Sequence, residues 1–292
     1  MLFAATVLIG SGNVAQITAL DALGPFTIVA LRSLVAIVVL LPFAVIELRG
    51  PASWTPGMLP CLSVAATYFA ASIVAQQIGA MTTTATNIGF LINMSAVFVP
   101  MLLWFTIRER PPLLAWPTAV IAVVGAYLVT GAGAVSATVG DALCLLAGLM
   151  DGVWIIALAV IVPQCRAPAC MVFILYATTG LLSLPFALTE TVAEGAILAA
   201  APEILWLGGM TSAFGFLLST KAQSVLSPCV VAVIFCFEAI VSAVLGRLFL
   251  GEMITLVGFV GAVLIILAVL MSQMPLPRWL QRQDDLEMRT TW

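Results

Sequence analysis

The residues that could do chemistry in this chain are two acidic side chains inside long apolar stretches. Glu238 lies about ten residues into one such stretch, and Asp151 lies near Gly148 and Gly152 in another. An unpaired charge in an apolar environment costs several kcal/mol or forces protonation. Glu238 could therefore bind a ligand's ammonium group or carry a proton. The alternative is a protonated side chain that hydrogen-bonds a neighbour and has only a structural role.

Amide, hydroxyl and aromatic side chains inside such stretches are the other candidates. Tyr68, Ser72 and Gln76 are spaced four residues apart, so they share one face of a helix. A lone serine can instead bond its own helix carbonyl, and asparagines also join helices to one another. With these alternatives open, the candidate substrate-binding residues are Ser11, Asn13, Tyr68, Gln76, Asn87, Phe90, Asn93, Trp154, Ser212, Phe216 and Glu238.

The overall composition indicates the environment in which these apolar stretches lie. Hydrophobic residues make up 63% of the 292 residues and charged residues 8%, against roughly 25% charged residues in soluble domains. The mean hydropathy is +1.22. Because too little polar surface remains to cover a water-soluble globule, the sequence indicates an integral membrane protein.

Several kinds of site are excluded or disfavoured by the residue types. Histidine is absent, which excludes imidazole metal sites and His-based catalytic triads. The six cysteines show no C-x-x-C spacing and mostly lie in apolar runs, where a free cysteine behaves as a small hydrophobe. The net charge of −3 is spread along the chain without a basic run, so we expect no nucleic-acid partner. We expect neither cofactor nor metal; the expected partners are a small-molecule substrate and the lipid bilayer, and a homo-oligomer stays open.

Ten stretches are long enough to cross a membrane as helices, since each crossing needs about 20 residues. The predicted spans are residues 2–19, 25–46, 58–79, 82–106, 112–131, 140–162, 168–189, 204–222, 228–250 and 254–273. The fifth and tenth spans carry almost no polar residues, so we expect them at the periphery. Residues 275–292 begin with Pro275, which stops the last helix, and are expected to form a cytoplasmic tail.

The basic residues indicate the orientation, because Lys and Arg concentrate in cytoplasmic loops. If both termini are cytoplasmic, eight of the ten basic residues lie inside. These eight are Arg49, Arg108, Arg110, Arg166, Lys221, Arg278, Arg282 and Arg289. Arg247 alone lies at an outer end, and Arg32 lies within the second span. The opposite orientation would reverse the bias, so we predict cytoplasmic termini.

The chain also resembles itself at one constant offset, close to half its length, which we call the repeat offset. It carries residues 25–47 onto residues 168–190 without a gap, and seven of the 23 positions are identical. The last identity pairs Glu47 with Glu190. Each half would hold five helices, an odd number, so the second half would enter the membrane from the other side.

The predicted fold is therefore an all-α integral membrane protein with ten transmembrane helices. They would form two inverted five-helix repeats, residues 1–135 and 136–274, around a central cavity. Two inverted halves can rock about a site near the midplane and so give alternating access.

The first two helices carry a motif that resembles a known family. It runs Leu8-Ile9-Gly10-Ser11-Gly12-Asn13-Val14-Ala15 and continues with Gly24-Pro25-Phe26, Arg32 and Ala36. Glu109 and Glu252, which the repeat offset also relates, stand at the end of the fourth helix of each half. The pattern resembles the EamA-type members of the drug/metabolite transporter superfamily, and among them it looks most like the bacterial aromatic amino-acid exporters. The resemblance implies a multi-pass protein of the cell inner membrane that exports small neutral or zwitterionic metabolites.

The function we expect is secondary transport, with two rival classes. No phosphate-binding loop appears, which disfavours ATP-driven transport by this chain alone. A membrane-embedded enzyme would need reactive groups clustered at one depth, whereas Asp151 and Glu238 have no basic or metal-binding partner in the sequence. A channel or structural subunit is disfavoured by the repeat and by the lack of a charged ring. A carrier of the same superfamily for a different metabolite or drug stays open.

Overall fold

All regular structure in the described part of the chain is helical. The computed structural model describes residues 1–50, 55, 57–107, 115–129, 138–251 and 256–273. In those residues the elements are α1 (Leu2–Leu20), α2 (Pro25–Leu48), α3 (Met58–Gly79), α4 (Ala85–Ile92), α5 (Ser95–Leu102), the π-helical η1 (Leu103–Ile107), α6 (Ala115–Val129), α7 (Val139–Cys165), α8 (Pro168–Ala187), α9 (Ala196–Ala199), α10 (Ala201–Leu205), η2 (Trp206–Gly215), α11 (Phe216–Gln223), α12 (Pro228–Phe235), α13 (Phe237–Leu245), η3 (Gly246–Leu250) and α14 (Leu256–Gln273).

Eight helical spans within the described residues are long and apolar enough to cross a membrane. They are Leu2–Leu20, Pro25–Leu48, Met58–Gly79, Ala85–Phe105, Val139–Cys165, Pro168–Ala187, Ala201–Gln223 and Pro228–Leu250. The bounds predicted for these eight spans agree with the structure to within three residues. Two shorter apolar helices accompany them, Ala115–Leu128 and Leu256–Met271. The chain is thus a helical bundle of the kind that forms a multi-pass membrane protein.

Two of the long spans are interrupted where they touch each other. The span Ala85–Phe105 is interrupted at Asn93, between α4 and α5, and the span Pro228–Leu250 is interrupted at Cys236, between α12 and α13. The Cys236 thiol donates a weak hydrogen bond to the backbone oxygen of Asn93, with sulfur and oxygen 3.8 Å apart. The two interruptions therefore meet inside the bundle.

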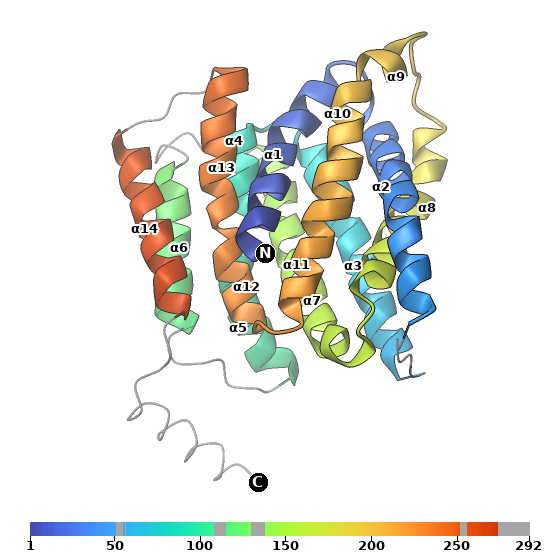
Figure 1. The fold of residues 1–292 in the computed structure, drawn as a ribbon. Helices are drawn as coiled ribbons and strands as arrows, with labels where there is room; N and C mark the ends of the chain where they lie inside the picture. Colours follow the sequence, from blue (N-terminus) through green and yellow to red (C-terminus); the bar gives the residue numbers. More distant parts are fainter. Residues whose placement is uncertain (51–54, 56, 108–114, 130–137, 252–255, 274–292) are drawn as a thin grey trace, which may run out of the picture.

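α2 and α8 lie side by side (Figure 1), and the end of α2 caps the start of α8. The Glu47 carboxylate accepts hydrogen bonds from the backbone N–H groups of Ala169 and Cys170, at 2.8 and 3.1 Å. The first N–H groups of a helix have no partner within the helix, and a carboxylate there also interacts favourably with the helix dipole. Glu47 thus stabilises the first turn of the neighbouring helix.

The reverse contact is made at the other end of the same pair. Glu190 follows α8, and its carboxylate accepts hydrogen bonds from the backbone N–H groups of Phe26 and Thr27, at 3.0 and 2.8 Å. The Thr27 hydroxyl donates a third bond to it, at 2.6 Å. Because each helix ends beside the start of the other, α2 and α8 are antiparallel.

α6 and α14 form a separate pair at one side of the bundle (Figure 1). A Cβ at Gly125 would lie 2.7 Å from the backbone oxygen of Gly261 and 2.9 Å from Ile265. Glycine at position 125 therefore lets the two backbones approach closely, as small residues do between membrane helices. The position of this pair agrees with the scarcity of polar residues in the two helices.

Some sequence predictions fall on residues that the structure does not describe. The tail at 275–292 and the glutamates Glu109 and Glu252 lie outside the described residues.

Candidate functional site

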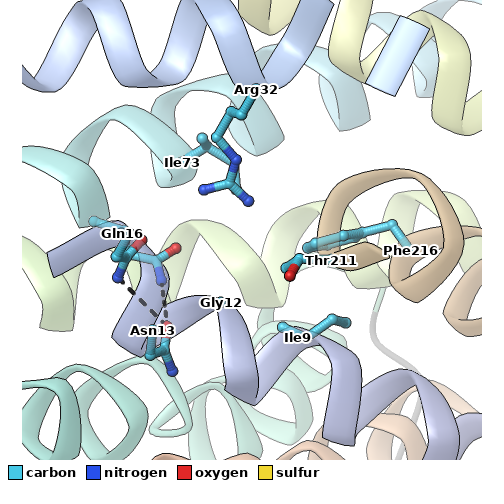
Figure 2. Close-up of a pocket in the computed structure, with 9 residues that line it drawn as sticks. Ile9, Gly12, Asn13, Gln16, Arg32, Ile73, Thr211 and Phe216 are labelled. Atoms are coloured by element: carbon cyan, nitrogen blue, oxygen red, sulfur yellow. Dashed lines mark hydrogen bonds between the residues drawn. The ribbon is translucent and has the colours of Figure 1, made fainter. Parts of the chain in front are cut away.

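A polar pocket of about 20 Å³ lies where helices from both halves of the chain meet (Figure 2). α1 contributes four of the nine lining residues, and α2, α3, η2 and α11 contribute the rest. The lining residues are Ile9, Gly12, Asn13, Gln16, Arg32, Ile73, Gln76, Thr211 and Phe216. Amide, hydroxyl and guanidinium groups thus share this space with apolar side chains, which is the usual make-up of a small-molecule site.

Asn13 is the centre of the hydrogen-bond network at this pocket. Its side-chain amide nitrogen donates to Oε1 of Glu238 at 2.7 Å and to the hydroxyl of Ser242 at 2.9 Å. Its side-chain oxygen accepts from the amide nitrogens of Gln16 at 3.4 Å and Gln76 at 3.1 Å. Both donor positions and both acceptor positions of the Asn13 amide are occupied, which fixes its orientation.

Two glycines in α1 make this network possible. A Cβ at Gly10 would lie 2.9 Å from the Cβ of Val241 on α13, and a Cβ at Gly12 would lie 2.7 Å from Cγ2 of Thr211 on η2. Their absence lets α1 approach both helices closely. Asn13 can therefore reach Glu238 on α13 while it still faces the pocket.

Arg32 enters the pocket from α2. Its side chain is only 3% exposed, and its Nε donates to the hydroxyl of Ser212 at 3.1 Å. An arginine inside a membrane span is costly, and such residues usually face a water-filled cavity or a binding partner. Figure 2 shows its guanidinium directed toward the space between Gln16 and Thr211.

An aromatic cluster, defined as Phe69, Trp154, Tyr176 and Phe216, lies beside the pocket. The ring of Phe69 packs edge-on against the other three, with ring centroids 5.3, 5.1 and 5.1 Å away. Phe216 belongs to the cluster and also lines the pocket. The cluster thus provides a rigid apolar wall.

The second intramembrane acid, Asp151, is held next to this cluster. Its Oδ1 accepts hydrogen bonds from the Trp154 indole N–H at 2.7 Å and from the Ser72 hydroxyl at 2.6 Å. Asp151 does not line the pocket. Its contacts fix the orientation of the Trp154 ring, which is itself only 2% exposed.

The structure brings six of the predicted substrate-binding residues to this region. Asn13, Gln76 and Phe216 line the pocket. Glu238 is one hydrogen bond behind Asn13, and Ser212 is one hydrogen bond behind Arg32. The sixth, Trp154, lies in the aromatic cluster.

The other five predicted residues lie elsewhere. Ser11 donates to the backbone oxygen of Leu8 at 2.6 Å and accepts from the Trp206 indole N–H at 2.9 Å. Tyr68 is 41% exposed on the outer surface of the bundle. The remaining three face other helices or their own helix: Asn87 is buried beside the Thr84 helix cap, Phe90 packs against Tyr127, and Asn93 donates its amide to the backbone oxygen of Gly89.

Four polar residues of the site were absent from the predicted set, namely Gln16, Arg32, Thr211 and Ser242. Arg32 had a clear signal, because it is a basic residue inside a predicted span. Ser242 stands four residues after Glu238, on the same helix face. Thr211, whose hydroxyl donates to the backbone oxygen of Leu8 at 3.1 Å, had no signal that separates it from other threonines.

A metal site does not appear in the described part of the chain. No group of three or more cysteine, aspartate or glutamate residues is close enough there to hold an ion. The five buried cysteines are free thiols, and Cys61 is free and half-buried.

The described helices and their buried polar pocket define a multi-pass membrane protein, and comparison with known proteins identifies the family. The model of the EamA-like transporter family matches residues 1–131 and 138–274. The chain belongs to this family, whose members are transporters. No curated protein matches the chain significantly. A solved structure described as "Crystal structure of protein" matches with a TM-score of 0.71 and 14% identity, over 93% of this chain and 95% of that chain. At this identity the likeness shows the fold alone.

Proposed function

We propose that this chain is a secondary transporter that exports small neutral or zwitterionic metabolites, amino acids first among them, across the bacterial inner membrane by alternating access. The observation that carries the proposal is the pocket around Asn13. It lies deep among apolar helices, and it joins residues of both halves of the chain. Polar groups at such a depth usually mark a substrate or ion pathway.

The chemistry of the lining favours an amino acid over a highly charged substrate. Gln16 and Gln76 offer neutral amides, Phe216 offers an aromatic face, and Arg32 is the one cationic side chain among the lining residues. A sugar phosphate would call for clustered basic residues. Phe216 and the aromatic cluster behind it support aromatic amino acids as the first substrates to test.

The contacts between α2 and α8 support two inverted five-helix halves, residues 1–135 and 136–274. The repeat offset relates Glu47 to Glu190 and also relates the N–H groups that the two carboxylates bind. Two antiparallel helices with equivalent contacts at both ends are what an inverted repeat produces. In this arrangement α6 and α14 are the fifth helices of the two halves, which makes ten spans.

Transport in liposomes that contain only this protein tests the proposal. We expect time-dependent exchange of radiolabelled phenylalanine or another neutral amino acid across the membrane. Gln76→Ala should reduce the rate at least tenfold, because it removes a pocket amide that bonds Asn13. Gln164→Ala is the matched control, since the Gln164 amide bonds the backbone oxygen of Val160 at an exposed site. Chemical conversion of solutes, or a nonselective leak, would instead support an enzyme or a channel.

Cysteine labelling tests the proposed orientation. In a cysteine-free background, Gly50→Cys should react with impermeant reagents only from the cytoplasmic side. Glu194→Cys should react only from the outside. Gly50 follows the C-terminal end of α2 and Glu194 follows that of α8, and these two ends lie at opposite ends of the antiparallel pair. Labelling of both positions from the same side would contradict the proposed topology.

A further inference from the structure

The guanidinium of Arg32 has unused hydrogen-bond donors inside the pocket. Its Nε donates to Ser212, and its nearest other polar neighbour is the Tyr176 hydroxyl, with which no hydrogen bond of normal geometry forms, so donors of the two terminal amino groups stay unused by the described residues. Figure 2 shows those groups directed into the space that the lining residues enclose. The side chain is 97% buried, since 3% of it is exposed. A buried cation without a counter-ion is costly, so a bound anion would stabilise it.

A second unpartnered group lies close to the same guanidinium. The Tyr176 hydroxyl is buried and lies within reach of both Arg32 and Ser212, yet its contacts with them lack the geometry of a normal hydrogen bond. Buried hydroxyl groups are nearly always hydrogen-bonded. The region around Arg32 therefore holds more donors than the described protein groups use.

The opposite wall of the pocket offers acceptors. The amide nitrogens of Gln16 and Gln76 both donate to Asn13, and no hydrogen bond from a described residue engages their Oε1 atoms. Gln16 is buried and Gln76 half-buried, and both side chains line the pocket. Glu238 and Ser242 hold Asn13 in the orientation that keeps both glutamine nitrogens occupied.

We propose that Arg32 binds the carboxylate of the transported metabolite, while the Oε1 atoms of Gln16 and Gln76 receive its ammonium group. The proposal rests on the proposed transport function and specifies its substrate class as α-amino acids with a free carboxylate. A guanidinium matches a carboxylate with two parallel hydrogen bonds, which a neutral amide or ester cannot accept equally well. Ser212 is a positioning residue, because its bond to Nε sets the direction of the terminal amino groups.

Competition binding to the purified protein in detergent tests the carboxylate requirement. Radiolabelled L-phenylalanine is bound first, and three unlabelled competitors are then compared. They are L-phenylalanine itself, 3-phenylpropionate, which lacks the ammonium group, and L-phenylalaninamide, which lacks the carboxylate. We expect phenylalaninamide to bind about 100-fold more weakly than phenylalanine, because a charge-assisted pair is lost. We expect 3-phenylpropionate to fall between them. Equal competition by phenylalanine and its amide overturns the proposal.

Variants of the same contact make the test specific. Arg32→Gln should abolish the difference between phenylalanine and phenylalaninamide, and Arg32→Lys should keep part of it. Arg49→Gln, at an exposed position just after the same helix, is the matched control and should bind like the wild type. If Arg32→Gln does not fold, Ser212→Ala serves instead and should reduce the discrimination about threefold to tenfold. A Ser212→Ala or Arg32→Gln protein with unchanged discrimination contradicts the proposal.

Transport measurements separate this proposal from the proposed function. If liposomes move a solute without a carboxylate and neither phenylalanine nor 3-phenylpropionate binds, the Arg32 assignment is wrong and secondary transport stands. If phenylalanine binds in an Arg32-dependent way but crosses the membrane no faster than in empty liposomes, transport fails and the binding site stands.

Discussion

The aromatic cluster and the pocket differ in side-chain volume although the repeat offset relates them. The cluster residues Phe69, Trp154, Tyr176 and Phe216 fill the space between their helices with rings. The equivalent positions in the opposite halves hold Ser212, Ser11, Ser33 and Ile73. Ile73 lines the pocket and Ser212 holds Arg32. Aromatic rings occupy the positions of the cluster, whereas smaller side chains at the equivalent positions of the other half leave room for the pocket.

Polar residues of the pocket show the same asymmetry, whereas the helix ends do not. The offset places Leu175 opposite Arg32 and Ile156 opposite Asn13, so the second half lacks these pocket groups. At the helix ends, by contrast, Glu47 and Glu190 are identical and make equivalent contacts. Every helix start must satisfy its free N–H groups, but one site needs only one set of ligands. The comparison suggests that shared residues maintain the fold and that differing residues create the site.

The largest effect is expected when a ring of the aromatic cluster is replaced by a small side chain, like those at the equivalent positions near the pocket. Trp154→Ala removes a buried ring and its bond to Asp151, so it should lower the free energy of unfolding by about 3–5 kcal/mol. Thermal unfolding in detergent measures it. Trp154→Phe should lose less, because it keeps the ring contacts with Phe69. Trp104→Ala, at a 54% exposed position, is the matched control and should change little. A small loss for Trp154→Ala would contradict the rigid-wall role.

The second-largest effect is expected when a pocket residue is replaced by the residue type found at the equivalent position in the other half of the chain. Asn13→Ile, which copies Ile156, removes four hydrogen bonds and leaves Glu238, Gln16 and Gln76 without this partner. We expect the transport rate to fall about 100-fold, which corresponds to about 2.7 kcal/mol. Radiolabel exchange in liposomes at equal reconstituted protein measures it. Thr6→Val is the control, because Thr6 is buried in the same helix but bonds only the backbone oxygen of Leu2. A normal rate in Asn13→Ile would show that the asymmetry at this position is unrelated to function.

Much of the fold could be predicted from the sequence because the bilayer fixes the length of a helix. Proline at the starts of α2, α8 and α12 and the short connections made the bounds of those spans readable. The interruptions at Asn93 and Cys236 could not be predicted, because neither residue breaks a helix by itself. They arise where two helices contact each other.

The site was predicted less completely, for a related physical reason. A membrane helix is apolar on the side that faces lipid and on the side that faces the bundle, so the sequence does not tell which face points inward. Tyr68 and Gln76 were assigned to one inward face, yet Tyr68 is 41% exposed while Gln76 lines the pocket. Asn93 illustrates a second limit, since its own helix uses its amide nitrogen. Asn13 and Glu238 were found because an amide and an acid are conspicuous inside apolar spans.

A smaller effect on rate is expected from the acid behind Asn13. Glu238→Gln keeps the acceptor for the Asn13 amide but cannot exchange a proton, so it should insert and fold normally. We expect the transport rate to fall about tenfold, about 1.4 kcal/mol, and its dependence on pH between 5 and 9 to flatten. Glu194→Gln, at an exposed position, is the control for loss of an acid. An unchanged rate and pH profile would show that Glu238 is a structural hydrogen-bonding group.

The smallest effect tests how closely the two helix caps correspond. Glu47→Ala and Glu190→Ala should both lower stability, but Glu190→Ala should cost about 0.5–1.5 kcal/mol more, because Glu190 alone receives the extra bond from the Thr27 hydroxyl. Thr27→Val isolates that bond: it should destabilise the wild type by the same amount and have no further effect in the Glu190→Ala background. In the Glu47→Ala background its effect should persist in full, since that cap lies at the other end of the pair. Thermal unfolding of these single and double variants in one detergent measures all three differences. If Thr27→Val is equally costly in both backgrounds, the hydroxyl bond does not distinguish the caps, and the two ends of the α2–α8 pair are energetically equivalent.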